Sequence, residues 1–220
     1  MIIQWLGHAS FLLISNDGTK IIMDPYEAGA FGGTFKYRPI TISPDIVTVS
    51  HHHADHGYVE GLPNHFEVLN EPMNKVIKGI GFKGVGAYHD AEFGASRGKN
   101  IIWVVTVNHV RVCHLGDLGH ELSPIEIEKV GEVDILLAPV GGTYTLGPKE
   151  TTRVIDHLHP KITIPMHFKN EHVGFPLLPV DDFLAGKTNV VHLDKSELEL
   201  TKEQLPDQPQ IIVMKPELGG

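Results

Sequence analysis

Residues 50–57 read SHHHADHG and place four histidines and an aspartate within eight positions. The apolar run DIVTVS, residues 45–50, leads into this stretch and has the composition of a buried strand. Protonated histidines so close together would repel one another, and buried neutral imidazoles need partners. The stretch is therefore expected to bind something, and the rest of the chain must supply the remaining ligands.

The spacing of the histidines and the aspartate in this stretch limits the kinds of ligand that it can bind. The ordered positions read H-x-H-x-D-H and are His51, His53, Asp55 and His56. Alternating residues can point the same way, so His52 is expected to turn away from its neighbours. The adjacent aspartate and histidine can then serve a second centre, which implies two divalent ions. Imidazole and carboxylate ligands without a thiolate favour zinc, with manganese or iron as alternatives. A histidine-rich solvated loop is the competing interpretation, and the ordered Asp-His pair argues against it.

Length and composition indicate a globular protein that acts on small molecules. The chain has 220 residues, 41% hydrophobic and 20% charged, which is enough for one sizeable core in a single domain over residues 1–220. A formal net charge of -9 and the lack of a basic arm argue against a general nucleic-acid binder. We found neither a stretch of the length that spans a bilayer nor a signal-peptide pattern, so we expect a cytoplasmic location. The single cysteine, Cys113, is expected to be a buried core residue. The oligomeric state stays open.

Short strands separated by glycine dominate the predicted secondary structure. Three β-like runs in residues 2–24, with the turn signal NDG at 16–18, predict an antiparallel start. Helices are predicted at residues 123–131, where Ser123 and Glu126 form a capping box, and at 147–160. Further strands are predicted at 45–50, 78–88, 100–107, 110–117, 134–140, 161–167, 189–193 and 210–215.

Candidate ligands recur where these strands end. Asp24 follows IIM, His51 follows IVTVS, Asp117 follows VRVCHLG and His167 follows KITIPM. Ligands gather at the carboxyl ends of strands in layered α/β sheets, because rigid strands fix the geometry and the loops that follow can carry chemistry. Separate strands are therefore expected to converge on one site.

The order of these elements resembles the metallo-β-lactamase superfamily of metal-dependent hydrolases. IIMDP, SHHHADHG, GAYHD, HLGDLGH and IPMHF occur in the order of that family's signature, and WLGHASF and APVGGTYTLGPKE look like a branch of small hydrolases. That branch is similar to ascorbate-phosphate lactonase and, more distantly, to the phospholipase that cleaves N-acylphosphatidylethanolamine. The resemblance implies an α/β fold, a four-layer αββα sandwich with mixed sheets, and a two-metal site at one edge.

The resemblance also implies a ligand set. The first ion would take His51, His53 and His89, the second would take Asp55, His56 and His167, and Asp117 would bridge both. His109 and His114 compete with His89 for its place, and His172 competes with His167. Asp24 is expected to hold the histidine-bearing loop by hydrogen bonds, or to be purely structural. The other histidines, His65, His120, His157, His159 and His192, are expected to have surface or structural roles.

A metal-bound hydroxide would then attack an ester-type bond, a phosphodiester or lactone, in a small and anionic substrate. Asp55 or Asp117 could accept the proton, and His8 or Tyr144 could protonate the leaving group or contact the substrate. Two loops with cations, residues 29–39 with Arg38 and residues 93–100 with Arg97, could form a rim over that substrate; ordinary solvated loops are the alternative.

Two other function classes fit the same residues. One is iron redox chemistry on this scaffold, in particular a persulfide dioxygenase. The other is a metal-binding sensor without catalysis, although the ligand set leaves positions for water and so favours an enzyme. Nothing in the chain resembles the arm with which tRNA-processing members of the superfamily hold RNA.

Overall fold

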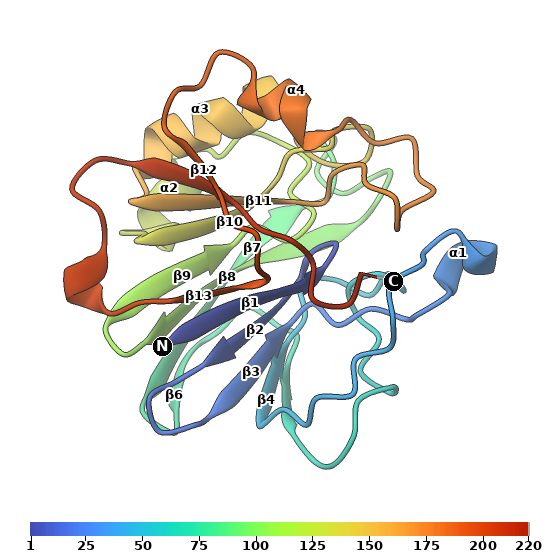
Figure 1. Ribbon diagram of the computed structural model, residues 1–220, viewed down its shortest axis with the longest axis vertical. Coiled ribbons are helices and arrows are strands. Elements are labelled where there is room, and N and C mark those ends of the chain that lie inside the picture. Colours follow the sequence, from blue (N-terminus) through green and yellow to red (C-terminus); the bar gives the residue numbers. More distant parts are fainter. Residues whose placement is uncertain (220) are drawn as a thin grey trace.

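The computed structural model describes residues 1–219, in which two β-sheets face each other (Figure 1). The six-stranded sheet has the order β13-β1-β2-β3-β4-β5. Its strands are β1 (Ile2–Gly7), β2 (Ser10–Ile14), β3 (Lys20–Met23), β4 (Ile46–Thr48), β5 (Glu67–Leu69) and β13 (Glu197–Glu199). β1, β2 and β3 are antiparallel, which confirms the predicted opening, whereas β3, β4 and β5 are parallel.

The eight-stranded sheet has the order β12-β14-β11-β10-β9-β8-β7-β6. Neighbours from β6 to β9 are antiparallel, and β9, β10, β11, β14 and β12 are parallel, so both sheets are mixed as predicted. The strands are β6 (Asn74–Ile77), β7 (Ile80–Tyr88), β8 (Lys99–Val107), β9 (Val110–His114), β10 (Ile135–Pro139), β11 (Ile162–Met166), β12 (Val190–His192) and β14 (Gln210–Val213).

Helices cover the outer face of the eight-stranded sheet. Helix α2 (Pro124–Val130) begins at the predicted capping box of Ser123 and Glu126, and α3 (Pro148–Leu158) ends at His159 in a left-handed conformation. The remaining helices are α1 (Ala30–Gly33), α4 (Val180–Leu184) and the 3-10 turn η1 (Lys202–Gln204). None of the helices in residues 1–219 has the length and apolar character needed to cross a membrane.

Three apolar layers hold the sandwich together. The central one lies between the sheets and includes the fully buried Trp5, Phe11 and Trp103. A second packs α2 and α3 onto the eight-stranded sheet and contains Cys113, whose thiol pKa is raised by burial to about 12. The third packs α1 and connecting segments onto the six-stranded sheet. Burial of each large apolar side chain contributes about 1.5–3 kcal/mol, so the sheets form a rigid support for the loops. The α/β sandwich predicted from the sequence is confirmed, with connecting segments making up most of the layer outside the six-stranded sheet.

The strand directions gather the candidate ligands at one edge. β1 and β3 both run antiparallel to β2, and β3 and β4 are parallel, so all three end on the same side. In the other sheet β7 and β9 both run antiparallel to β8, and β10 and β11 are parallel to β9. The segments that follow these strands carry the ligand set implied by the resemblance: His51, His53, Asp55, His56, His89, Asp117 and His167.

Candidate metal centre

Three histidines form the first group of candidate ligands at this edge. His51 and His53 lie on the loop after β4, and His89 directly follows β7. Nε2 of His51 lies 2.9 Å from Nδ1 of His53, and the ring centres of His51 and His89 are 4.8 Å apart. His53 is exposed, whereas the other two are buried. The ligand atoms of this group are close enough to hold one metal ion.

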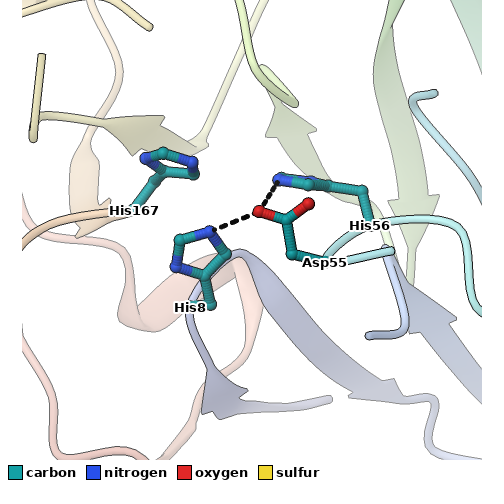
Figure 2. Close-up of side chains that lie close together, drawn as sticks. All are labelled: His8, Asp55, His56 and His167. Atoms are coloured by element: carbon teal, nitrogen blue, oxygen red, sulfur yellow. Dashed lines mark ion pairs between the residues drawn. The ribbon is translucent and has the colours of Figure 1, made fainter. Parts of the chain in front are cut away.

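His8, Asp55, His56 and His167 form the second group (Figure 2). Oδ2 of Asp55 lies 3.2 Å from Nε2 of His8 and 3.7 Å from Nε2 of His56. The His8 and His167 rings lie 4.1 Å apart, and Figure 2 shows Asp55 between His8 and His56. All four residues are buried. The sequence suggested His8 as a proton donor or substrate contact, and the structure places it within this group, against Asp55.

Asp117 lies between the two groups. Its Oδ1 is 3.1 Å from Nε2 of His56, while its Oδ2 is 3.2 Å from Nε2 of His89 and 3.4 Å from Nε2 of His167. One carboxylate thus contacts histidines of both groups. This is the placement that a bridging ligand requires.

Several buried polar atoms at this edge have no hydrogen-bond partner. Nε2 of His56 and Oδ1 of Asp117 are close to each other but are not aligned to hydrogen-bond, and both are inaccessible to water. Unpaired buried polar groups are costly, and residues 1–219 concentrate them here. Imidazole and carboxylate atoms left free in this way suit divalent metal ions, so the residues present fit the expected cofactor.

Asp24 orients histidines of both groups from behind. Its Oδ2 accepts from Nδ1 of His56 at 2.9 Å and from Oγ of Ser50 at 2.5 Å, while Oδ1 accepts from the backbone N–H of Ser50 at 2.7 Å. Because the Ser50 hydroxyl donates its hydrogen to Asp24, its oxygen can only accept from His51. Nδ1 of His51, 2.9 Å from Oγ, is therefore the donor in that contact. Nδ1 therefore carries the proton that each ring donates to this network, and Nε2 of His51 and of His56 faces the other ligands, as metal binding requires.

The electrostatics of the site place ligands in the form that binds a cation. Burial first, and the neighbouring His56 second, lower the pKa of His51 to about 3, so this imidazole is neutral at pH 7. Burial alone would raise the pKa of Asp117, but the neighbouring His167 and His56 hold it well below its usual value. Burial likewise opposes the charging of His56, but Asp117 and Asp55 outweigh it and raise its pKa well above the usual value. The carboxylates thus favour positive charge at this point, which a metal ion supplies in place of a proton.

Backbone conformation at the site is costly and specific. His8, Asp24 and His167 have φ values of 53°, 48° and 51°, in the left-handed region that non-glycine residues rarely adopt. Such positions cluster at functional sites, where the surrounding structure enforces them. A Cβ at Gly119 would lie 2.3 Å from the carbonyl of His89, so only glycine lets these two segments approach.

A cavity of about 330 Å³ opens over the two groups. Ligand residues form its floor, and Tyr144, Arg97, Phe31 and Phe175 line its sides. Arg38 does not line this cavity; its guanidinium donates to the backbone carbonyl of Glu217 at 2.8 Å. Both loops suggested by the sequence therefore border the cavity, the first through Phe31 and the second through Arg97, but of their two arginines Arg97 alone lines it.

The competing histidines belong to neither ligand group. His114 donates from Nε2 to the Ala9 carbonyl at 2.7 Å and accepts the Gly116 N–H on Nδ1, so both of its ring nitrogens are used structurally. His109 lies in the turn between β8 and β9. His172 packs against the ring of Tyr37, and His52 is exposed.

Sequence reasoning missed Asp90, which orders the loop after His89. Its carboxylate accepts four backbone N–H groups, from Glu92, Gly94, Ser96 and Arg97, at 2.7–3.0 Å. Burial would raise the pKa of Asp90, but these four donors outweigh it and lower the pKa to about 2. The aspartate beside glycine and serine in DAEFGASRG is a signal for such a loop.

Comparisons with known proteins agree with this geometry. The family model of the β-lactamase superfamily domain matches residues 2–167. A crystal structure from Thermotoga maritima, described as a Zn-dependent hydrolase of the metallo-β-lactamase superfamily, superposes with a TM-score of 0.80 at 38% identity and 97% coverage of both chains. A metal-dependent hydrolase from Methanopyrus kandleri is 26% identical over 98% of this chain and 97% of its own length. Another from Pyrobaculum arsenaticum is 29% identical over 84% of this chain and 91% of its own. The chain therefore belongs to the metallo-β-lactamase superfamily of metal-dependent hydrolases.

Proposed function

We propose that the protein is a two-metal hydrolase that cleaves an ester-type bond, a phosphodiester or a lactone, in a small anionic substrate. The observation that carries this proposal is the position of Asp117, which offers one oxygen to His56 and the other to His89 and His167. A carboxylate placed in this way between two sets of free imidazole atoms is suited to bridge a pair of cations.

One ion would be held by His51, His53 and His89, the other by Asp55, His56 and His167, with Asp117 shared. Zinc suits these ligands best, and manganese or iron would also fit them. When bound, two such ions lower the pKa of a water molecule and stabilise the negative charge that develops on the substrate oxygen.

Residues of the chain itself would accept and donate the protons of the reaction. Asp55 and Asp117 both line the cavity and are ionised, so either can accept a proton there. His8 lies 3.2 Å from Asp55 and does not line the cavity, so it would position that carboxylate or exchange a proton with it. Tyr144 lies on the cavity wall, 36% exposed, where its phenol can donate to the leaving group.

The shape of the cavity supports a small substrate. Phe31 and Phe175 pack edge to face, with ring centres 5.0 Å apart, and Phe175 also contacts Tyr144. These rings would shield the reacting bond from bulk water, which strengthens electrostatic interactions inside the cavity.

We also propose one domain over residues 1–220, a cytoplasmic location, and no nucleic-acid partner, in keeping with the acidic charge and the buried Cys113.

Separate loading of the metal-free protein with zinc, manganese and iron, followed by a panel of phosphodiesters, lactones and thioesters, tests this proposal. We expect turnover of a phosphodiester or a lactone with at least one metal, and its loss on chelation. Binding of the metals without turnover of any ester would favour the sensor, and oxygen consumption with a persulfide by the iron form would favour the dioxygenase.

A further inference from the structure

A second and larger cavity, of about 840 Å³, lies beside the metal centre. It shares His53 and Arg97 with the smaller cavity over the ligands, so the two spaces adjoin. The first ligand group borders it through His51 and His53. The protein therefore has room next to the reacting bond for a further part of the substrate.

The wall of this second cavity carries two cations without acidic partners. The side chain of Arg97 donates to the Thr143 carbonyl at 3.4 Å and lies over the Tyr144 ring, 5.7 Å from its centre. Within residues 1–219 neither Arg97 nor Lys99 forms an ion pair with a carboxylate, although the exposed Glu71 also lines the cavity. In a chain of net charge -9, two unpaired cations beside a metal centre mark a place for an anion.

The backbone of Arg97 is fixed relative to the metal ligands. Its N–H donates to Oδ2 of Asp90 at 2.7 Å, and the next residue, Gly98, accepts the N–H of His89 at 3.0 Å. The segment from Asp90 to Arg97 is therefore closed by a hydrogen bond between its first and last residues. An anion held by the guanidinium would lie at a defined place relative to His89, which is how a positioning contact selects a substrate.

Apolar side chains complete the second cavity. Pro72, Ala87 and Ile101 line it together with the cations. This combination suits a ligand with a short apolar segment and an anionic end, because the segment packs on the apolar lining and the end pairs with the guanidinium.

We propose that the larger cavity binds the non-reacting anionic arm of the substrate, and that Arg97, which borders both cavities, is the residue that selects for it. The anion is a carboxylate or a phosphate, joined by an apolar segment to the bond that is cleaved over the metal centre. This inference rests on the proposed hydrolase function for the position of the cleaved bond.

Two esters of equal acyl length test the proposal in the metal-loaded protein: para-nitrophenyl hydrogen glutarate, with an anionic end, and para-nitrophenyl pentanoate, which is neutral. We expect Arg97→Gln to lower the ratio of kcat/KM for the glutarate ester over the pentanoate ester by about tenfold or more. Arg38→Gln removes the same charge outside both cavities and should leave this ratio within about twofold. An equal fall of the ratio in both variants, or no fall in Arg97→Gln, would overturn the assignment.

A binding measurement separates this inference from the proposed function. If the wild-type protein hydrolyses neither ester, calorimetric titration with glutarate and with glycerophosphate still tests the cavity. We expect Arg97→Gln to weaken binding of one of these probes by about tenfold while Arg38→Gln does not, and the probe affected identifies the anion as carboxylate or phosphate. Equal affinities in the wild type and Arg97→Gln, or no binding of either probe to the wild type, would exclude the anion site.

Discussion

Oδ2 of Asp24 accepts a hydrogen bond from Nδ1 of His56 at 2.9 Å. The same oxygen accepts the hydroxyl of Ser50, which in turn accepts from Nδ1 of His51. One fully buried carboxylate behind the site thus determines, for one histidine in each ligand group, which ring nitrogen faces the other ligands. The two halves of the centre are coupled through Asp24 as well as through Asp117.

Asp24→Asn should therefore weaken both metal positions. An asparagine offers one oxygen where three donors now meet, and its amide N–H groups would face donors. We expect metal affinity to fall by about 10–100-fold, measured by competition with a chromophoric chelator. Asp17→Asn, in the exposed turn between β2 and β3, is the matched control. Unchanged affinity in Asp24→Asn would mean that this network does not orient the ligands.

Gly119→Ala should damage the first ligand group. The added Cβ would lie 2.3 Å from the carbonyl of His89, and since both partners are backbone the segments must move apart. We expect about one bound ion fewer per chain by elemental analysis, because a displaced His89 no longer completes its group. Gly81→Ala, whose Cβ would meet Thr106 at 3.5 Å, is a control in ordinary contact. Equal metal content in both variants would contradict the role given to this glycine.

Asp90→Ala should disturb metal binding and substrate selection together. The carboxylate holds four backbone N–H groups of the loop that carries His89 at one end and Arg97 at the other. We expect faster amide hydrogen exchange in residues 92–97, weaker metal binding, and a lower preference for the glutarate ester. If the ester preference fell while exchange stayed slow, Asp90 would act by some route other than ordering this loop.

The sequence predicts the strand ends better than it predicts what surrounds them. Asp24, His51, Asp117 and His167 each follow an apolar run, and strand direction alone brings such positions to one edge. The short strands β5, β6 and β13 were missed because their burial patterns are mostly exposed, and an exposed three- or four-residue strand has little hydrophobic periodicity.

The rest of the site depends on contacts between distant segments. Nothing in the spacing of HLGDLGH says that His114 is used by the Ala9 carbonyl, or that His8 lies against Asp55. Likewise Arg38 and Arg97 occupy similar glycine-containing loops, and only their tertiary placement separates them. Residue type and order predict the chemistry of the centre, whereas tertiary packing decides which cations face it.

Asp134 should make stability depend on pH far from the metal centre. Burial would raise its pKa, but Arg111 and Lys202 outweigh this and lower it from 3.8 to about 2. A folded-state pKa below the unfolded one adds stability that is present above about pH 4 and is lost as the pH falls toward about 2. The difference in free energy of unfolding between wild type and Asp134→Asn, both metal-free, should shrink over this range in urea titrations. A difference that stays constant would show that the ion pairs do not bias the carboxylate.

Metal content per chain, measured by elemental analysis after equilibration with zinc and removal of free ion, tests the central claim most directly. We expect about two ions in the wild type and a loss at both positions in Asp117→Ala, because the bridging carboxylate serves both. His167→Ala should lose only the second ion, and the exposed His52→Ala should lose neither. A wild type that binds no divalent metal under any loading condition, or a His52→Ala variant that loses more metal than Asp117→Ala, would contradict the two-metal account.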